Sequence, residues 1–341
     1  MSAPDRWTVA EAGGKAHFTE PLGPARIAAL DKAIAWTSGS DVNDPDFGRS
    51  PEIREFLRPH FTDLADRLLD GDGIAILSGF PVRDWPEAKL ARAFRLIGAT
   101  LGHGVSQSRL GDRLGRVTDV SGTNPDERGY RTSRELRLHT DANDIVGLLA
   151  VRTARAGGHS RLANALAVHD AMAARAPDRL RELVQGFPYH WRGEQPDGEP
   201  PITDYRIPVF SEVDGKVSTV YLSEHITWAA EEGHPFTALQ KAALQMFEEL
   251  ANSPDYCMEF DLAEGDGLFF NNLTTLHSRT SYEDHDDPAE KRLLLRLWIR
   301  ADRSRPVVDA IRRFYPPDGI EPRADQGTIF KRTAERDVSP G

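Results

Sequence analysis

Apolar residues recur at helical spacing in two stretches of the first hundred residues and then give way to short, strand-like runs. PEIREFLRPHFTDLADRLLDGDG (51–73) predicts a helix that ends on glycines, and WPEAKLARAFRLIGATLG (85–102) predicts a second helix that begins near Pro86 and stops at Gly102. Between them, GIAILSGFP (73–81) predicts a buried strand. We therefore expect residues 1–110 to form N-terminal helices and a strand that pack on a core.

From about residue 115 onward, short alternating or continuously apolar runs predict strands. These segments are RVTDVSG (116–122), ELRLHTD (135–141), IVGLLAVRTA (145–154), YHWRG (189–193), IPVFSEVDGKVSTVYL (207–222), YCMEFDL (256–262), GLFFNNLTTLHSRT (267–280) and RLLLRLWIR (292–300). Helical spacing interrupts them at 167–186, where we expect one short helix, and at 234–253.

The chain contains neither an internal repeat nor a linker rich in Pro, Gly and Ser. We therefore expect one domain over residues 1–341, mainly β with flanking helices, whose strands form a sandwich or barrel. The core is expected over about 115–302. Residues 303–341 are polar and contain Pro and Gly, so we expect a C-terminal tail with a mobile end.

Composition and charge limit the kinds of partner, cofactor and cellular location that we expect for this protein. The formal net charge of −11 and the pI near 5.5 argue against nucleic acid or an anionic membrane as the main partner and favour a small anionic or zwitterionic substrate. Cys257 is the sole cysteine, which rules out an intrachain disulfide and a thiolate metal cluster. The start of the chain lacks a signal-peptide pattern, and no apolar run reaches about 18 residues, so we expect a cytoplasmic protein. The sequence is compatible with a homo-oligomer.

Two ionisable residues, His139 and Asp141, interrupt an otherwise apolar run, LRLHTDANDIVGLLAV. Burying an unpaired charge is costly, so such residues require partners. In a strand, alternate residues share a face, so we expect these two side chains to point the same way, opposite to Leu138 and Thr140. This arrangement suits a metal site. A strand-edge pair that hydrogen-bonds to its neighbours would have the same spacing.

An iron(II) site of the two-histidine, one-carboxylate type needs a second histidine from a distant strand. GLFFNNLTTLHSRT supplies His277 at the end of what we expect to be one long apolar strand, although a lone histidine there is more often an ordinary core residue. The His-x-Asp spacing also occurs at His285 and Asp287, in the charged stretch YEDHDDPAEK. We interpret that second match as a solvated loop.

The last apolar run, RLLLRLWIR, contains three arginines. Strand alternation places Arg292, Arg296 and Arg300 on one face with Leu294 and Trp298, and Leu293, Leu295, Leu297 and Ile299 on the other. A planar guanidinium binds a carboxylate in a bidentate manner, so we expect Arg292 and Arg296 to bind a ligand carboxylate. Arg300 lies near the strand end, and we expect it to face solvent.

The motifs His139-x-Asp141, GGHS (157–160), NNLTTLHSRT and RLLLRLW, in this order and at these intervals, resemble the taurine dioxygenase and clavaminate synthase-like family of Fe(II)/2-oxoglutarate-dependent oxygenases. Each motif alone is weak, but four in order are specific. The resemblance spans about Gly73 to Arg300. It implies a double-stranded β-helix, or jelly-roll, core with iron(II) held by His139, Asp141 and His277.

The same resemblance implies that Arg292 binds the distal carboxylate of 2-oxoglutarate with the hydroxyl of Ser160, a position where many relatives carry threonine. Arg296 would reach the cosubstrate or the prime substrate. Residues 165–258 would contain a lid over the site. Relatives that halogenate their substrates carry a small residue in place of Asp141, so we do not expect halogenation.

The implied reaction consumes 2-oxoglutarate and O2, releases succinate and CO2, and hydroxylates an unactivated C–H bond of a small polar, amino-acid-like or zwitterionic molecule. Desaturation, epoxidation and ring closure require the same ligands and remain alternatives. So does a non-catalytic jelly roll that binds a metal or a ligand. The candidate substrate-contacting residues, each of which also fits an ordinary surface loop, are Gln107, Tyr130, Thr132, Arg192, Glu194, Glu224 and His225.

Overall fold

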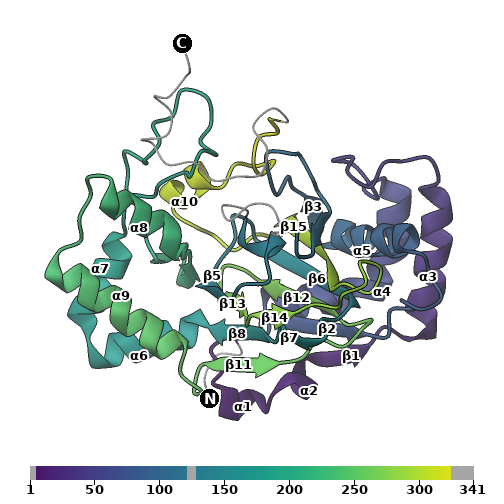
Figure 1. Cartoon of the computed structure of the whole chain (residues 1–341), viewed down its shortest axis with the longest axis horizontal. Coiled ribbons are helices and arrows are strands. Elements are labelled where there is room, and N and C mark those ends of the chain that lie inside the picture. The colour runs from purple at the N-terminus through teal and green to yellow at the C-terminus, as the bar shows by residue number, and fades with distance from the viewer. Residues whose placement is uncertain (1–4, 121–127, 324–341) are drawn as a thin grey trace.

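The computed structural model describes residues 5–120 and 128–323, in which a larger and a smaller β-sheet lie face to face (Figure 1). The larger sheet has the strand order β1-β2-β12-β6-β15-β3, with β4 also paired to β15, and comprises β1 (Thr19–Pro21), β2 (Ile74–Ser78), β3 (Gly102–Gly104), β4 (Gly115–Val117), β6 (Ile145–Arg152), β12 (Gly267–Asn271) and β15 (Leu293–Ala301). The smaller sheet has the order β11-β8-β13-β5 and comprises β5 (Leu136–His139), β8 (Ser160–Asn164), β11 (Cys257–Phe260) and β13 (Thr275–Arg279). Two further pairs are β7 (Ala156–Gly157) with β14 (Tyr282–Glu283) and β9 (Phe210–Val213) with β10 (Lys216–Thr219).

Apolar side chains from both sheets fill the space between them. Ile76, Phe270 and Trp298 come from the larger sheet, and Leu162 and Met258 come from the smaller one. Alternation along β15 sends its remaining apolar residues, Leu293, Leu295, Leu297 and Ile299, to the opposite face. The expected division of this strand is confirmed, and so is the expected jelly-roll core with flanking helices.

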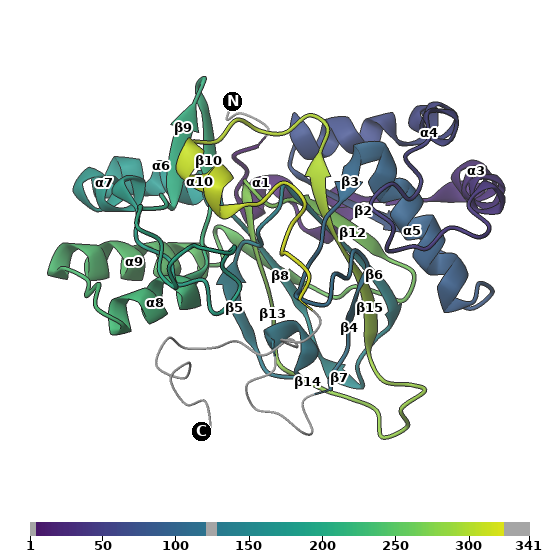
Figure 2. The ribbon, with the colours of Figure 1, turned by 90° about the horizontal axis from the view of Figure 1, so that it is seen from above.

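Helices cover the outer face of each sheet, as Figure 2 shows. The larger sheet is covered by α3 (Gly23–Trp36), α4 (Pro51–Leu69) and α5 (Glu87–Leu101), and the short helices α1 (Val9–Ala12) and α2 (Lys15–Phe18) precede them. The smaller sheet carries α6 (Ala165–Arg175), α7 (Pro177–Gln185), α8 (Ser223–Glu231) and α9 (Ala238–Ala251), and α10 (Asp309–Phe314) follows the last strand. None of the helices in the described ranges has the length and apolar character needed to cross a bilayer.

The elements predicted in the N-terminal part are confirmed. Helix α4 begins after Ser50, whose hydroxyl accepts the N–H of Ile53, and Pro51 occupies its first position. Helix α5 begins after Pro86 and ends before Gly102. Glycine is required there because a Cβ would lie 2.0 Å from the carbonyl oxygen of Arg300 on β15.

The expected single long strand over GLFFNNLTTLHSRT is wrong. The chain forms β12 in the larger sheet, turns through Asn272 and Leu273, and returns as β13 in the smaller sheet. The turn is stabilised by Asn271, whose side-chain oxygen accepts the N–H of Leu273 at 3.0 Å. Two consecutive asparagines are typical of turns, because their side chains hydrogen-bond to nearby backbone groups. His277 therefore lies in the middle of a short strand that faces β12 across the core.

Other expectations fail within the region assigned to a lid. YHWRG forms no strand but only an isolated bridge between His190 and Ile202. The single helix expected over 167–186 is two helices, because Pro177 ends the first and begins the second. Helix α8, which carries Glu224 and His225, begins directly after the strand run expected over 207–222.

The first part of the expected polar tail is ordered structure. Helix α10 buries Ile311 and Phe314, and Gly319 forms a parallel bridge with Ser106. The expectation of a mobile end concerns residues 324–341, which lie outside the described residues. Residues 121 and 122 of the strand expected over 116–122 lie outside the described residues. In the part that is described, the strand is β4, Gly115–Val117.

Candidate active site

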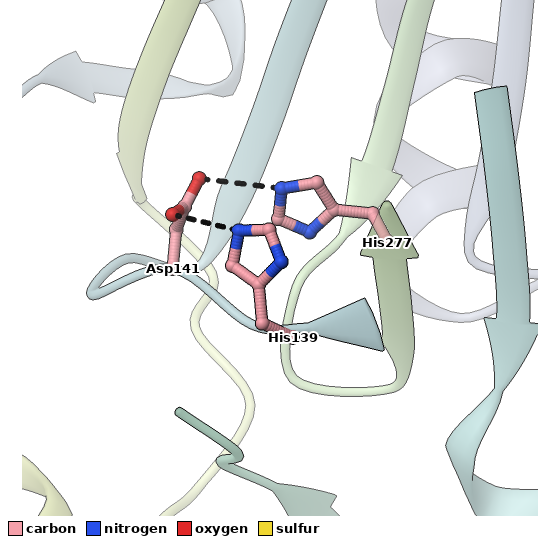
Figure 3. Close-up of side chains that lie close together, drawn as sticks. All are labelled: His139, Asp141 and His277. Atoms are coloured by element: carbon pink, nitrogen blue, oxygen red, sulfur yellow. Dashed lines mark ion pairs between the residues drawn. The ribbon is translucent and has the colours of Figure 1, made fainter. Parts of the chain in front are cut away.

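Strands β5 and β13 bring two histidines together on the smaller sheet. His139, the last residue of β5, pairs directly with His277 of β13, and the ring centroids are 4.2 Å apart. Directly opposed residues of an antiparallel pair have side chains on the same face. Nε2 of His139 lies 3.8 Å from Oδ1 of Asp141, and Nε2 of His277 lies 3.5 Å from Oδ2 of the same carboxylate (Figure 3).

Asp141 is held by other parts of the jelly roll and not by strand β5, which ends two residues earlier. Its backbone N–H donates to Oδ1 of Asn272 at 2.8 Å, and Nδ2 of Asn272 donates back to the Asp141 carbonyl at 2.6 Å. Nε1 of Trp298 donates to the carboxylate Oδ2 at 2.8 Å. The side chains of His139 and Asp141 lie together, as expected. The expected reason, alternation along one strand, is wrong, because Asp141 lies outside β5. The turn after β12 and the indole from β15 position the carboxylate.

The hydrogen bonding of His139 leaves its Nε2 lone pair directed at the other two side chains. Nδ1 lies 2.8 Å from the carbonyl oxygen of Arg137, which can only accept, so Nδ1 carries the proton. Desolvation and the neighbouring His277 lower the pKa of His139 to about 4, against the opposing effect of Asp141. The ring is neutral at pH 7, and neutral imidazole is the form that binds metals.

The three side chains form a donor set that fits iron(II). Burial alone would raise the pKa of Asp141, but the hydrogen bond and charge of His277, together with Arg296 and His139, lower it well below its usual range. The ligand atoms all lie within 4.8 Å of one another. Two nitrogens and one oxygen suit a non-haem iron(II) site with open positions, whereas structural zinc sites are closed by four ligands.

A pocket of about 860 Å³ opens beside these side chains. Its walls come from four regions. The segment between β4 and β5 contributes Arg128, Gly129, Tyr130, Thr132, Arg134 and Glu135. The sheets contribute Ser160, Ser278, Arg279, Leu294, Arg296 and Trp298; the expected lid region contributes Trp191, Arg192, Glu194, Pro196, Leu222, Ser223, Glu224, His225 and Trp228; and the segment after β15 contributes Phe314 and residues 316–322. The pocket is large enough for two small molecules.

Arg292 and Ser160, the residues expected to bind the cosubstrate carboxylate, both line this pocket. Arg292 is 5% exposed, and its Nη1 atom is buried without a hydrogen-bond partner in the described part of the chain. Gly158 allows the close approach of this side chain, because a Cβ there would lie 3.3 Å from Nε of Arg292. A buried N–H without a partner is costly, and a ligand carboxylate would satisfy it.

Arg296 reaches nearer to the iron ligands. Its guanidinium carbon lies 4.2 Å from the ring centre of Tyr130 and 4.9 Å from that of Trp298. Nε donates to Oε1 of Gln107 at 2.7 Å, whereas Nη2 is buried and has no partner among the residues described. Burial lowers the pKa of Arg296, and the nearby charge of Asp141 raises it. We expected Gln107 to contact the substrate, but its side chain instead accepts a hydrogen bond from Arg296 and positions it.

The expectation for Arg300 is wrong, whereas the interpretation of His285 and Asp287 as loop residues is confirmed. Arg300 does not face solvent, because Nη1 donates to Oδ1 of Asp144 at 2.8 Å and Nη2 donates to the carbonyl oxygen of Pro316 at 3.1 Å. It therefore anchors the segment after β15. His285 and Asp287 lie in an irregular loop outside the metal-ligand cluster, which confirms that interpretation.

The other candidate substrate-contacting residues, Tyr130, Thr132, Arg192, Glu194, Glu224 and His225, all line the pocket. Arg192 pairs with Glu224, and its guanidinium carbon lies 4.5 Å from the ring centre of Trp228. Its φ of 58° is in the left-handed region, which side chains other than glycine occupy at a cost. Glu194 pairs with Arg128. This wall of the pocket therefore carries both signs of charge.

Several pocket residues were missed from the sequence. Trp191 and Phe314 stack with centroids 4.5 Å apart, and they come from segments expected to be a strand and a tail. Arg279 was also missed, although its position two residues after His277 places it on the same strand face. That spacing was the available signal.

Comparison with known proteins identifies the family. The chain matches the family described as "Taurine catabolism dioxygenase TauD, TfdA family" over residues 44–298. The chain belongs to this family. It is 32% identical over 306 residues to the "FR-33289 synthase" of Streptomyces rubellomurinus (strain ATCC 31215), covering 88% of this chain and 90% of the relative. It is 25% identical over 312 residues to the "Taurine hydroxylase-like protein SAT17" of Stachybotrys chartarum (strain CBS 109288 / IBT 7711), covering 85% and 77%.

Solved structures agree on the fold. An asparagine oxygenase in complex with Fe(II), 2S,3S-3-hydroxyasparagine and succinate aligns with a TM-score of 0.62 at 18% identity, over 83% of this chain and 93% of that one. The non-heme iron oxygenase OrfP in complex with Fe, succinate and (3S)-hydroxy-L-Arg aligns with a TM-score of 0.64 at 17% identity, over 83% and 94%. Family membership, with the His-Asp-His cluster, makes this TauD/TfdA-family protein an Fe(II)- and 2-oxoglutarate-dependent oxygenase and decides against a non-catalytic jelly roll.

Proposed function

We propose that this oxygenase hydroxylates an unactivated C–H bond of a small polar molecule that carries an anionic or zwitterionic group. One observation carries the proposal. The converging ligand atoms of His139, Asp141 and His277 lie beside a pocket lined by Arg292 and Arg296, each of which has a buried nitrogen with no hydrogen-bond partner in the described part of the chain. Desaturation, epoxidation and ring closure would use the same residues and are the second candidates.

In this proposal His139, Asp141 and His277 hold the iron. When bound, iron(II) and 2-oxoglutarate supply the oxidising power, consuming O2 and releasing succinate and CO2. The chain's own contribution is orientation: the Arg137 carbonyl fixes the tautomer of His139, and Trp298 and Asn272 fix the carboxylate of Asp141. Such outer contacts typically change metal affinity about 10- to 100-fold when removed.

Arg292 and Ser160 bind the distal carboxylate of 2-oxoglutarate. The unsatisfied Nη1 of Arg292 supports this role, because a carboxylate would complete its hydrogen bonding. Arg296, stacked on Tyr130 and held by Gln107, is placed to meet an anionic group of the cosubstrate or the prime substrate near Asp141.

The prime substrate occupies the part of the pocket between the lid region and the segment after β15. The ion pairs Arg192–Glu224 and Arg128–Glu194 offer partners for both a carboxylate and an ammonium group. The names of the aligned oxygenases, with hydroxyasparagine and hydroxyarginine bound, support an amino-acid-like molecule. We further propose a cytoplasmic location, which suits a chain with a single cysteine. A homo-oligomer remains compatible with the proposal.

Anaerobic titration tests the proposal. Iron(II) and 2-oxoglutarate, added together without air, are expected to give a visible charge-transfer band that requires both. In air, slow succinate release is expected, and amino acids and their derivatives can then be screened for faster release. Absence of a band that depends on both additions would overturn the proposal.

A further inference from the structure

A second buried arginine stands beside Arg292 at the cosubstrate end of the pocket. Arg279 is the last residue of β13 and pairs directly with Ser160 of β8, so their side chains share a face. It also follows His277 by two residues, which places it on the face that carries the iron ligand. Arg279 is 5% exposed and lines the pocket.

The guanidinium of Arg279 is only partly satisfied by the protein. Nη2 donates to the carbonyl oxygens of Thr132 at 2.8 Å and Arg134 at 2.5 Å, and Nε donates to that of Thr280 at 3.3 Å. Nη1 is buried and has no partner in residues 5–120 and 128–323. The two N–H groups of Nη1 are thus left to donate to a ligand.

Tyr282 brings the two arginines together. Its ring centre lies 4.7 Å from the guanidinium carbon of Arg279 and 5.0 Å from that of Arg292. A guanidinium is not deprotonated at neutral pH, so both groups are charged. Two cations this close, each with a buried N–H group that has no partner among the described residues, favour an anion that contacts both of them.

We propose that Arg279 is a second cation for the distal carboxylate of the cosubstrate, which it would bind together with Arg292 and Ser160. This inference rests on the proposed function. A carboxylate has about four lone-pair directions and can accept from two guanidinium groups and a hydroxyl at once. Arg279 thereby selects 2-oxo acids that end in a carboxylate over those that end in a methyl group.

The competing explanation is that Arg279 only supports the loop that it hydrogen-bonds, which carries Tyr130 beside Arg296. Two cosubstrate analogues separate these roles. 2-Oxoglutarate and 2-oxopentanoate share the 2-oxo acid end and the chain length, but only the former has a distal carboxylate. Loss of a carboxylate contact weakens the first alone, whereas a displaced loop weakens both.

The experiment measures dissociation constants of both acids for the iron(II)-loaded protein without air, from the visible band. Arg279→Gln is expected to raise the constant for 2-oxoglutarate about tenfold or more and to leave that for 2-oxopentanoate within about twofold, as expected for a lost hydrogen bond between charged groups. Arg279→Lys keeps a cation and is expected to recover part of the preference. It also serves if the glutamine variant does not fold.

Arg113→Gln is the matched control, because it removes one positive charge from another part of the same pocket. It is expected to keep the wild-type preference between the two acids. Equal weakening of both acids by Arg279→Gln, or no change in either, would overturn the inference while leaving the proposed function in place. A wild-type protein that gives no band with either acid would instead overturn the proposed function.

Discussion

The two ends of the pocket are built in different ways. The cosubstrate end consists of side chains on or next to β8, β13 and β15, where Ser160, Arg279 and Arg292 lie in fixed register and Nη1 of each arginine has no hydrogen-bond partner among the described residues. The opposite end consists of loops, helix α8 and residues 316–322, and its arginines Arg128 and Arg192 pair with Glu194 and Glu224.

This difference separates two tasks. Strand positions are held by a ladder of backbone hydrogen bonds and cannot slide independently, which suits a site that must meet one small molecule and a metal in a fixed geometry. Loops tolerate sequence change without loss of the core, and binding specificity resides in them in many folds. The protein therefore combines a sheet-built reaction centre, common to its family, with a loop-built wall that can be particular to its substrate.

Removal of an iron ligand should have the largest effect and should leave the fold intact. His139→Ala or His277→Ala removes a ligand that no neighbouring side chain can replace, because both positions are set by the β5–β13 pairing. Iron binding should weaken strongly and turnover should vanish, while the circular dichroism spectrum is retained. Turnover that persists in either variant would mean that the sheet-built end is not the reaction centre.

Arg292, which directly precedes β15, and Arg296, which lies within it, should act at different ends of the pocket. Arg292→Leu leaves a cosubstrate carboxylate without its partner, a loss of ~2–5 kcal/mol for a buried charge pair. The Michaelis constant for 2-oxoglutarate should therefore rise by about one to three orders of magnitude, with iron affinity nearly unchanged. Arg292→Lys should restore only part of the affinity.

Arg296→Leu is the matched comparison for that variant. We expect it to impair prime-substrate binding, or the coupling of succinate release to substrate oxidation, more than cosubstrate affinity. Titration of 2-oxoglutarate into both iron-loaded variants under nitrogen compares them directly. Loss of the visible band in Arg296→Leu at concentrations where Arg292→Leu still gives it would reverse the assignment.

Acid should destabilise the metal-free protein through the sheet-built end. The pKa of His139 is about 4 in the folded protein and near 6.5 when unfolded, so between these values the unfolded chain binds a proton that the folded one does not. Stability from this group is complete above about pH 6.5 and is lost as pH falls toward 4. Chemical denaturation at pH 7.5 and 4.5 should show a loss up to ~3 kcal/mol larger in the wild type than in His139→Gln. Equal losses in the two proteins would contradict the prediction.

The smallest effect is expected at the loop-built wall. Glu224→Gln removes one charge of a pair whose acid is largely exposed, and such pairs are worth only ~0–1 kcal/mol to stability. Thermal stability should therefore stay nearly unchanged, and cosubstrate affinity should not move. The Michaelis constant for the prime substrate should rise about two- to tenfold if Glu224 meets a cationic group. A change in 2-oxoglutarate affinity would show that the two ends are not separate.

The sequence by itself determined the local pieces and the chemistry they carry. Helical spacing identified α4 and α5, alternation divided the two faces of β15, and the ordered motifs singled out His139, Asp141 and His277 as well as Arg292 and Ser160. These features depend on residue type and on neighbours close in sequence, so a single chain contains enough information to predict them.

The tertiary structure alone decided how those pieces meet. No spacing indicates that Asn272 and Trp298 hold Asp141, that the chain switches sheets between β12 and β13, or that Gln107 supports Arg296. These contacts join residues far apart in sequence, and they form only when the two sheets close on each other. The same reason explains why the segment after β15, polar in sequence, becomes a wall of the pocket. Its position depends on contacts with Arg300 and Ser106, and Ser106 lies far away in sequence.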